Sequence, residues 1–207
     1  HPNPHIHKKG IYQTIRRKLW SAHYVMKQGQ IIKTFKSKKG NTVIIRYPKW
    51  EDLDTVTEFV NALIEEDTFL MLPEKQTHTS EASWMAKTFD DIENNKKIHI
   101  VAEVNGEYAG NCEIRIHERR QTHVGDIGIS IAAQYRQEGI GYQLLSTLIE
   151  EGKRAGLKLL ILHCFENNDR ALHLYEKLGF TRSGTVPGVY AYKGSHIGEV
   201  TLYLPLK

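Results

Sequence analysis

The sequence predicts an α/β domain in which a mixed β-sheet carries helices on its faces. Two observations lead to this expectation. The first half of the chain contains short alternating segments separated by turn signals such as Asn105-Gly106, which is typical of antiparallel hairpins. After residue 124 the chain alternates strand, helix, strand, helix and strand, which places helices between strands of one sheet.

The composition indicates a globular protein rather than a disordered or membrane-spanning one. Hydrophobic residues make up 40% of the chain and charged residues 25%, which is ordinary for a soluble domain. Apolar runs such as Leu159–Leu162 are far too short to span a bilayer. The two cysteines, Cys112 and Cys164, are too few for a disulfide framework and too far apart for a CxxC metal site. We therefore expect reduced thiols, no metal and a cytoplasmic location.

Basic residues are concentrated at the start of the chain. Residues 1–40 hold ten Lys or Arg and no Asp or Glu, whereas the remaining chain carries 18 basic and 24 acidic residues. Such an extension suits contact with nucleic acid, a ribosome or an acidic membrane surface. The favoured alternative is that it folds back on the acidic body of its own chain or of a homodimer partner. Ile11, Ile15 and Leu19 recur at helical spacing, so an amphipathic helix is expected over 11–27.

In the first half of the chain the sequence predicts two hairpins, two helices and one further strand. Lys39-Gly40 and Asn105-Gly106 are the turn signals of the hairpins. Apolar residues recur at helical spacing between Trp50 and Ile64. The expected elements are strands 30–36 and 41–46, helices 50–64 and 81–92, strands 98–104 and 108–117, and a strand over 124–132.

The second half carries stronger signals. Residues 139–155 place Ile140, Leu144 and Leu148 on one helical face, and Gly156 follows where a left-handed cap is needed. A nearly continuous apolar run predicts a strand buried on both faces over 158–164. The expected elements after it are a helix from an Asn168 cap to Leu178 and two closing strands, 181–187 and 189–204.

The most informative segment lies between a predicted strand and a long helix and reads Arg136-Gln137-Glu138-Gly139-Ile140-Gly141. A glycine turn at a helix start leaves N–H groups unpaired at the positive end of the helix dipole. Glycines there let a bulky anion approach the backbone, which is the requirement for cradling a pyrophosphate. Arg136, Gly139 and Gly141 match the motif Q/R-x-x-G-x-G/A. The segment therefore resembles the coenzyme A loop of the GNAT superfamily of N-acetyltransferases.

Two residues depart from the usual form of this motif. Gln137 stands where glycine is frequent, and Glu138 brings a negative charge near the phosphates. Because backbone groups make most of the contacts, we expect Glu138 to point to solvent. The resemblance implies that the cofactor-binding residues of the loop are Arg136, Gln137, Glu138, Gly139, Ile140 and Gly141.

A second motif follows about thirty residues later. Asn168-x-x-Ala171-x-x-x-Tyr175-x-x-x-Gly179-Phe180 resembles the GNAT segment written NxxAxxxYxxxGF. The resemblance covers roughly residues 42–204 and is most specific over 124–180. We therefore expect a GNAT domain over 41–207 and a basic N-terminal extension over 1–40.

The resemblance implies a mostly antiparallel sheet with one parallel pair at the cofactor cleft. The cofactor would be acetyl-CoA, with its pantetheine arm in a gap between the strand ending near Ala132 and the next strand. Backbone N–H groups of Ile131 and Ala132 would bind the pantetheine, and Asn168 would hydrogen-bond the cofactor. Tyr175 would act as the acid for the leaving thiolate, since full proton transfer from a phenol is uphill by only about 2 kcal/mol.

The general base and the acceptor site are less sharply indicated. The resemblance to spermidine N-acetyltransferases points to Asp126 as the base, with Glu113 on the neighbouring strand as the other candidate. The acceptor site is expected between the Phe69–Leu72 cluster and the closing strands that carry Tyr190 and Tyr192. The predicted activity is acetyl transfer to the primary amine of a small molecule by direct attack. The alternatives are a protein N-terminal or lysine acetyltransferase and a non-catalytic acyl-CoA-binding module.

Overall fold

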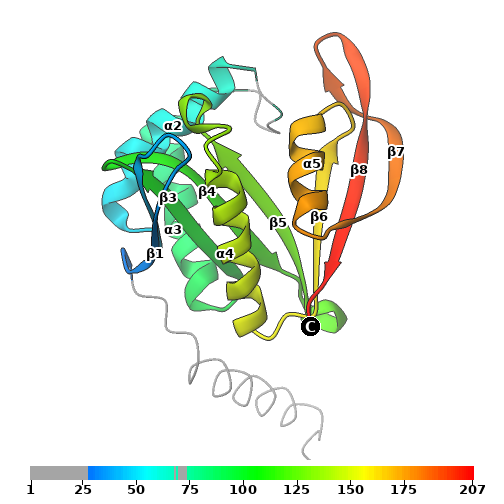
Figure 1. Ribbon diagram of the computed structural model, residues 1–207, viewed down its shortest axis with the longest axis horizontal. Coiled ribbons are helices and arrows are strands. Elements are labelled where there is room, and N and C mark those ends of the chain that lie inside the picture. The colour runs from blue at the N-terminus through cyan, green and yellow to red at the C-terminus, as the bar shows by residue number, and fades with distance from the viewer. Residues whose placement is uncertain (1–27, 68, 70–73) are drawn as a thin grey trace, which may run out of the picture.

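The computed structural model describes residues 28–67, 69 and 74–207 and contains one eight-stranded mixed sheet (Figure 1). The strand order is β1-β2-β3-β4-β5-β6-β8-β7, and only the pair β5–β6 is parallel. The strands are β1 (Ile31–Lys36), β2 (Thr42–Arg46), β3 (Lys97–Val104), β4 (Glu107–Ile116), β5 (Val124–Ile131), β6 (Leu159–Phe165), β7 (Thr181–Tyr192) and β8 (Ser195–Pro205).

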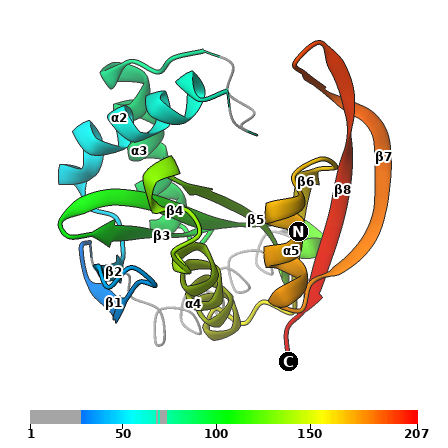
Figure 2. The ribbon, with the colours of Figure 1, turned by 45° about the horizontal axis from the view of Figure 1, so that its top comes forward.

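Helices cover both faces of this sheet, as predicted (Figure 2). On one face, Leu144 and Leu148 of α4 pack with Ile100 of β3 in the larger core. On the other face, Phe59 of α2 and Met85 of α3 belong to a second core. The helices are α2 (Leu53–Glu65), α3 (His78–Glu93), α4 (Ile140–Arg154) and α5 (Asp169–Lys177), with short 3-10 turns at Trp50–Asp52, Arg119–Gln121 and Ala133–Tyr135. Within the described ranges, no helix is long and apolar enough to cross a bilayer.

The first predicted hairpin is confirmed. β1 pairs with β2 from Ile31↔Arg46 to Lys36↔Thr42, so residues 31–36 belong to the sheet. The predicted boundary at residue 40 falls within the turn of this hairpin, and we propose that the domain begins with β1. The helix predicted over 11–27 lies outside the described residues.

The last hairpin turns later than predicted. The predicted strands 181–187 and 189–204 placed the turn at Gly188, but β7 runs through Pro187 and Gly188 and the turn lies at Lys193-Gly194, with φ values of 48° and 76°. The register between β7 and β8 shifts between Val186 and Tyr190, so a bulge absorbs the Pro-Gly pair. Proline is tolerated there because β7 is an edge strand that needs no second ladder of hydrogen bonds.

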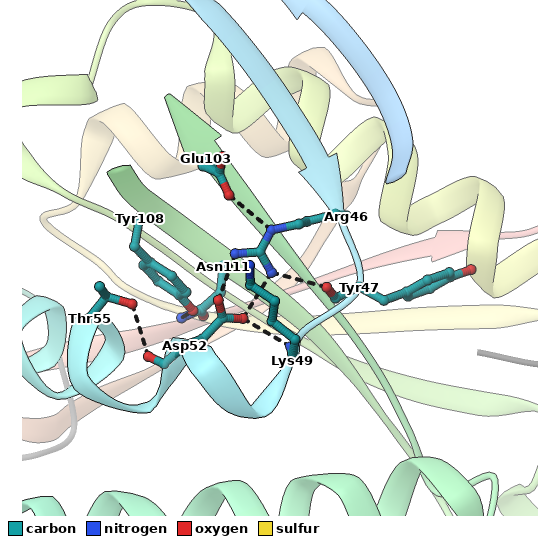
Figure 3. A network of polar contacts seen from close by, with 8 residues as sticks. All are labelled: Arg46, Tyr47, Lys49, Asp52, Thr55, Glu103, Tyr108 and Asn111. Atoms are coloured by element: carbon teal, nitrogen blue, oxygen red, sulfur yellow. Dashed lines mark hydrogen bonds and ion pairs between the residues drawn. The ribbon is translucent and has the colours of Figure 1, made fainter. Parts of the chain in front are cut away.

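A buried ion pair fixes the start of α2 against the sheet (Figure 3). Arg46, at the end of β2, donates to both carboxylate oxygens of Asp52 at 2.6 and 2.9 Å and to Glu103 of β3 at 3.0 Å. Asp52 also accepts from the backbone N–H of Lys49 at 3.0 Å. Arg46 and Asp52 are 6% and 3% exposed. Because water no longer solvates these two charges, each is stabilised by its contact with the other.

Replacing Arg46 with alanine should therefore destabilise the fold strongly. The R46A variant leaves the carboxylate of Asp52 buried without its partner, and we expect the free energy of unfolding to fall by about 3–5 kcal/mol. The matched control is K87A, which removes the exposed pair between Lys87 and Asp91 and should cost about 0.5 kcal/mol or less. Urea denaturation of both variants measures the difference. Equal losses would show that the Arg46 pair does not anchor α2.

Candidate active site

The parallel pair β5–β6 separates along its length. Cα partners run only from Val124↔Leu159 to Ile127↔Leu162. Beyond these residues β5 continues to Ile131 along β4, while β6 continues along β8, so the two strands diverge (Figure 1). The splay that the resemblance implied is confirmed.

A cleft of about 940 Å³ opens at this separation. The cleft is lined by the β1–β2 hairpin, the end of α2 with the residues that follow it, the end of β5 with the glycine loop and the first turn of α4, the start and inner face of α5, and the turn of the β7–β8 hairpin. Its size and its walls fit a long, anionic ligand with an extended arm. The lining residues used below are Lys36, Ser37, Lys38, Glu66, Phe69, Ile131, Arg136, Gln137, Glu138, Gly139, Gly141, Asn168, Tyr175 and Tyr192.

The glycine loop forms the predicted turn at the start of α4. Gly139 is the N-cap residue with a φ of 84°, and Gln137 also adopts the left-handed region, with a φ of 64°. Glycine is frequent at the position of Gln137 because a side chain is strained there. The side chain of Ile140 is fully buried in the core, so this residue offers the cleft only its backbone. The N–H groups of the first turn of α4, which have no partner within the helix, could bind an anion at this end of the cleft.

Glu138 does not point to solvent, which corrects the sequence-based expectation. It is 3% exposed, and its carboxylate accepts from the Ser37 hydroxyl at 2.8 Å and from the Asn41 amide at 3.3 Å. Lys39 forms an ion pair with it at 3.0 Å. These donors, the Ser37 hydroxyl first, lower the pKa of Glu138, so the carboxylate stays ionised.

Arg136 is held by protein groups around the rim of the cleft. Its Nη2 donates to Glu66 Oε2 at 2.7 Å, its Nη1 donates to the other oxygen of that carboxylate, and its Nε donates to the Ile131 carbonyl at 2.9 Å. The guanidinium therefore ties the glycine loop to the end of α2 and to the end of β5. Sequence reasoning missed Glu66, because it lies 70 residues away from Arg136.

Of the two backbone donors expected for the pantetheine, only one is available. The N–H of Ala132 donates to the Ala109 carbonyl at 2.9 Å, so it faces β4 rather than the gap. Hydrogen-bonding directions alternate along an antiparallel strand. The N–H of Ile131 therefore points away from β4 and toward the separation from β6. The prediction that the Ala132 N–H binds the pantetheine is therefore wrong, whereas the Ile131 N–H is oriented as that prediction requires.

Tyr175 and Asn168 both line the cleft from α5. Asn168 caps the helix, because its side chain accepts from the Ala171 N–H at 3.3 Å. Tyr175 is 7% exposed and packs edge-on against Phe180. Burial, followed by the nearby Cys164, raises the pKa of Tyr175 well above its ordinary value. Its phenol is therefore protonated at any working pH.

Neither candidate base lines the cleft. Ile127 and Ile129 pack toward α4, so the side chain of Asp126 points to the opposite face of the sheet, where its carboxylate meets His117 Nε2 at 2.9 Å. Glu113 pairs with Lys97 at 2.9 Å. Burial alone would raise the pKa of Glu113, but the nearby His99, whose Nδ1 lies 3.5 Å from the carboxylate, and the charge of Lys97 outweigh it and lower the pKa to about 2.

Aromatic rings close one end of the cleft. Phe69 and Tyr192 stack with their ring centres 5.2 Å apart, and Phe165 stacks on Tyr190 at 3.9 Å. Phe69 also lies 5.3 Å from Phe165, so the rings join the loop after α2 to the β7–β8 hairpin. Phe69 and Tyr192, two residues named for the expected acceptor region, thus contact each other and line the cleft, whereas Tyr190 packs on Phe165 and is not among the lining residues. Leu70, Met71 and Leu72 lie outside the described residues.

The sequence is similar to those of known acetyltransferases. The phosphinothricin N-acetyltransferase of Streptomyces viridochromogenes is 27% identical over 165 residues, which cover 77% of this chain and 86% of that protein. The ribosomal protein bS18-alanine N-acetyltransferase of Escherichia coli is 25% identical over 123 residues, or 59% of this chain and 81% of that protein. The N-acetyltransferase aca1 of Schizosaccharomyces pombe is 29% identical over 98 residues, which cover 47% of this chain and only 42% of that protein.

Solved structures share the fold. An N-acetyltransferase from Staphylococcus aureus Mu50 superposes with a TM-score of 0.72 at 26% identity, covering 80% of this chain and 99% of that one. The microcin C7 self-immunity acetyltransferase MccE, solved with acetyl-CoA and AMP, has a TM-score of 0.69 at 16% identity over 79% of this chain and 92% of that one. The model of the acetyltransferase (GNAT) family matches residues 58–180, which is more than half of the chain. The chain therefore belongs to the GNAT family of acetyltransferases.

Proposed function

We propose that the protein transfers the acetyl group of acetyl-CoA to the primary amine of a small molecule. The observation that carries this proposal is the single cleft that brings together the glycine loop at the start of α4, the separation of β5 from β6 and the phenol of Tyr175. Membership of the GNAT family indicates the reaction class, acetyl transfer. The cleft offers a binding region for each part of the cofactor.

The walls of the cleft fit acetyl-CoA part by part. The first turn of α4, with Gly139 and Gly141, is suited to the pyrophosphate. The separated strands leave room for an extended pantetheine arm, and the Ile131 N–H points into that space. The cofactor would supply an activated thioester there. The protein's part is to orient that thioester and to exclude water from it.

Tyr175 is suited to stabilise the leaving group. A raised pKa makes full transfer of its proton to a thiolate more uphill than for an ordinary phenol. A hydrogen bond donated by the neutral phenol strengthens as negative charge grows on the sulfur, and this needs no completed transfer. Tyr175 therefore acts best as a hydrogen-bond donor that is present throughout the reaction.

Asp126 is the better of the two candidate bases. Glu113 is held by Lys97 and His99, and its pKa of about 2 makes it a poor proton acceptor. Asp126 is 29% exposed at its side chain and pairs with His117 at 2.9 Å. Because Asp126 lies outside the cleft, on the face of the sheet opposite α4, it would accept the proton of the amine through intervening water.

A small acceptor fits the closed end of the cleft better than a folded protein does. The Tyr192 hydroxyl donates to the Asp67 carbonyl at 3.1 Å, and Lys193 pairs with the Asp67 carboxylate at 3.7 Å. With the ring contacts of Phe69, these bonds connect the two walls and restrict access for a large substrate. Acetylation of a peptide N-terminus remains the second candidate, supported by the similarity to the bS18-alanine acetyltransferase.

The decisive experiment measures acetyl-CoA binding by calorimetry and then free-thiol release with a panel of amines, amino acids and peptides. Thiol release with small amines but not with peptides supports the proposal. Release with peptides alone favours the second candidate. Binding without release for any acceptor identifies a non-catalytic acyl-CoA-binding module, and no binding contradicts the assignment of the cleft.

Replacing Tyr175 with phenylalanine should lower turnover and spare cofactor binding. The Y175F variant removes one hydrogen-bond donor to the developing thiolate, which corresponds to a loss of about 100-fold in kcat. The Kd for acetyl-CoA should change less than about twofold, because the ring stays in place. Because its pKa is raised, wild-type Tyr175 should cause no fall in kcat up to at least pH 9. Unchanged turnover in Y175F would leave Tyr175 a packing residue.

Replacing Asp126 with asparagine should slow the reaction most for strongly basic amines. An amine with a pKa near 10.4 must lose a proton before attack, whereas an α-amino group near 8 is already partly neutral at pH 7.5. We therefore expect D126N to lower kcat about tenfold or more for the first class and less for the second. The control E113Q should reduce thermal stability instead. A D126N loss that is the same for both acceptor classes would rule out Asp126 as the base.

A further inference from the structure

The loop between β1 and β2 is bonded directly to the glycine loop. We define the hairpin loop as residues 37–41. Its Ser37 and Asn41 side chains donate to the Glu138 carboxylate at 2.8 and 3.3 Å, Lys39 forms an ion pair with it at 3.0 Å, and the Lys38 N–H donates to the Glu138 carbonyl at 3.0 Å. Four contacts from one loop thus converge on a single residue of the glycine loop.

This attachment comes from outside the part of the chain that matches the family model. The match begins at residue 58, whereas the hairpin loop ends at residue 41. A second contact holds the same hairpin on α4, because Lys33 Nζ of β1 donates to Gln143 Oε1 at 2.7 Å. The hairpin is therefore fixed over the start of α4 at two points.

The attachment also resolves an electrostatic conflict. A carboxylate beside an anion site repels the anion, and Glu138 immediately precedes the N-cap of α4. Here the carboxylate is turned into the hairpin loop, where it is 3% exposed and paired with Lys39. Its charge is thus compensated, and it serves as an anchor for the loop.

Lys38 is the residue that this anchor presents to the cleft. It is exposed, lines the cleft, and forms no ion pair with any other described residue. Its Cγ and Cε lie 3.9 Å from the point that a Cβ atom would occupy on Gly139. The neighbouring lysines are engaged, since Lys36 donates to Thr42 and Lys39 pairs with Glu138.

We infer that Lys38 binds the pyrophosphate of the cofactor and that Glu138 is a positioning residue that holds it there. This inference rests on the proposed function, because it requires acetyl-CoA in the cleft. Contact with Gly139 places the Lys38 side chain beside the anion site of α4, and this favours the pyrophosphate over the 3′-phosphate of the same cofactor. A lysine provides a point charge that suits phosphate oxygens.

The first test compares three ligands in K38A and in the wild type by calorimetry. The variant should bind acetyl-CoA about tenfold more weakly, the loss expected for one hydrogen bond to a charged group. Its affinity for 3′-dephospho-CoA, which keeps the pyrophosphate, should fall by the same factor. Its affinity for acetyl-pantetheine, which lacks the pyrophosphate, should not change. The control K87A, an equal charge change on α3, should bind all three as the wild type does.

Two results of this test would overturn the inference. Wild-type affinity of K38A for acetyl-CoA would show that Lys38 does not bind the cofactor. A loss that disappears with 3′-dephospho-CoA would assign Lys38 to the 3′-phosphate instead. If the wild type itself does not bind acetyl-CoA, the proposed function is wrong. That result differs from normal binding by both proteins, which would contradict only the role of Lys38.

The second test asks whether Glu138 acts through Lys38. In a double-mutant cycle, K38A should weaken acetyl-CoA binding about tenfold in the wild type but about twofold or less in an E138A background, because the loop is then no longer held. S37A, which removes one hydrogen bond from the same carboxylate, is the milder background if E138A melts at a much lower temperature. Additive losses in both backgrounds would show that Glu138 does not position Lys38.

Discussion

The site depends on one constraint, which is the early end of pairing between β5 and β6. After Ile127↔Leu162 each strand keeps its other neighbour, β4 for β5 and β8 for β6, so the sheet stays continuous on both sides of the gap. Alternation along β5 aims the Ile131 N–H into the gap, where no strand satisfies it. Because Ile131 lines the cleft, this N–H is available to a ligand in the gap. The same geometry that interrupts the ladder thus creates the binding site.

The placement of α4 follows from that constraint. β5 ends at Ile131 and α4 begins at Ile140, so the short connection delivers the helix start to the mouth of the gap. The body of the helix is fixed by fully buried residues such as Leu144 and Leu148, which pack on the sheet. Its first turn is then free to bind an anion instead of contributing to the core. The body of α4 thus stabilises the fold through its packing, and the N–H groups of its first turn remain available to a ligand.

Much of the fold could be predicted from local signals, because these depend on neighbouring residues. The Asn105-Gly106 turn, the Gly156 cap and the apolar face of α4 are confirmed, with φ values of 51° and 92° at the turn and 81° at the cap. The errors involve partners distant in sequence. Glu138 was expected in solvent because Ser37 lies 101 residues away, and Ala132 was assigned to the ligand because its bond to Ala109 depends on strand register. Periodicity and motifs contain no information on such pairs.

Two of the carboxylates that line the cleft beside the glycine loop, Glu66 and Glu138, are each compensated by a neighbouring cation. Glu66 is matched by Arg136, and Glu138 by Lys39, so each carboxylate has a cation in direct contact. The guanidinium of Arg136 is engaged by Glu66 and by the Ile131 carbonyl, so the proposed phosphate site would rely on the N–H groups of α4 and on a cation from another part of the chain. The β1–β2 hairpin is well placed to supply that residue, because it bonds to the glycine loop through Glu138 and to α4 through Lys33. The carboxylate of Glu138, which departs from the motif, is therefore the group through which the β1–β2 hairpin and the glycine loop are joined.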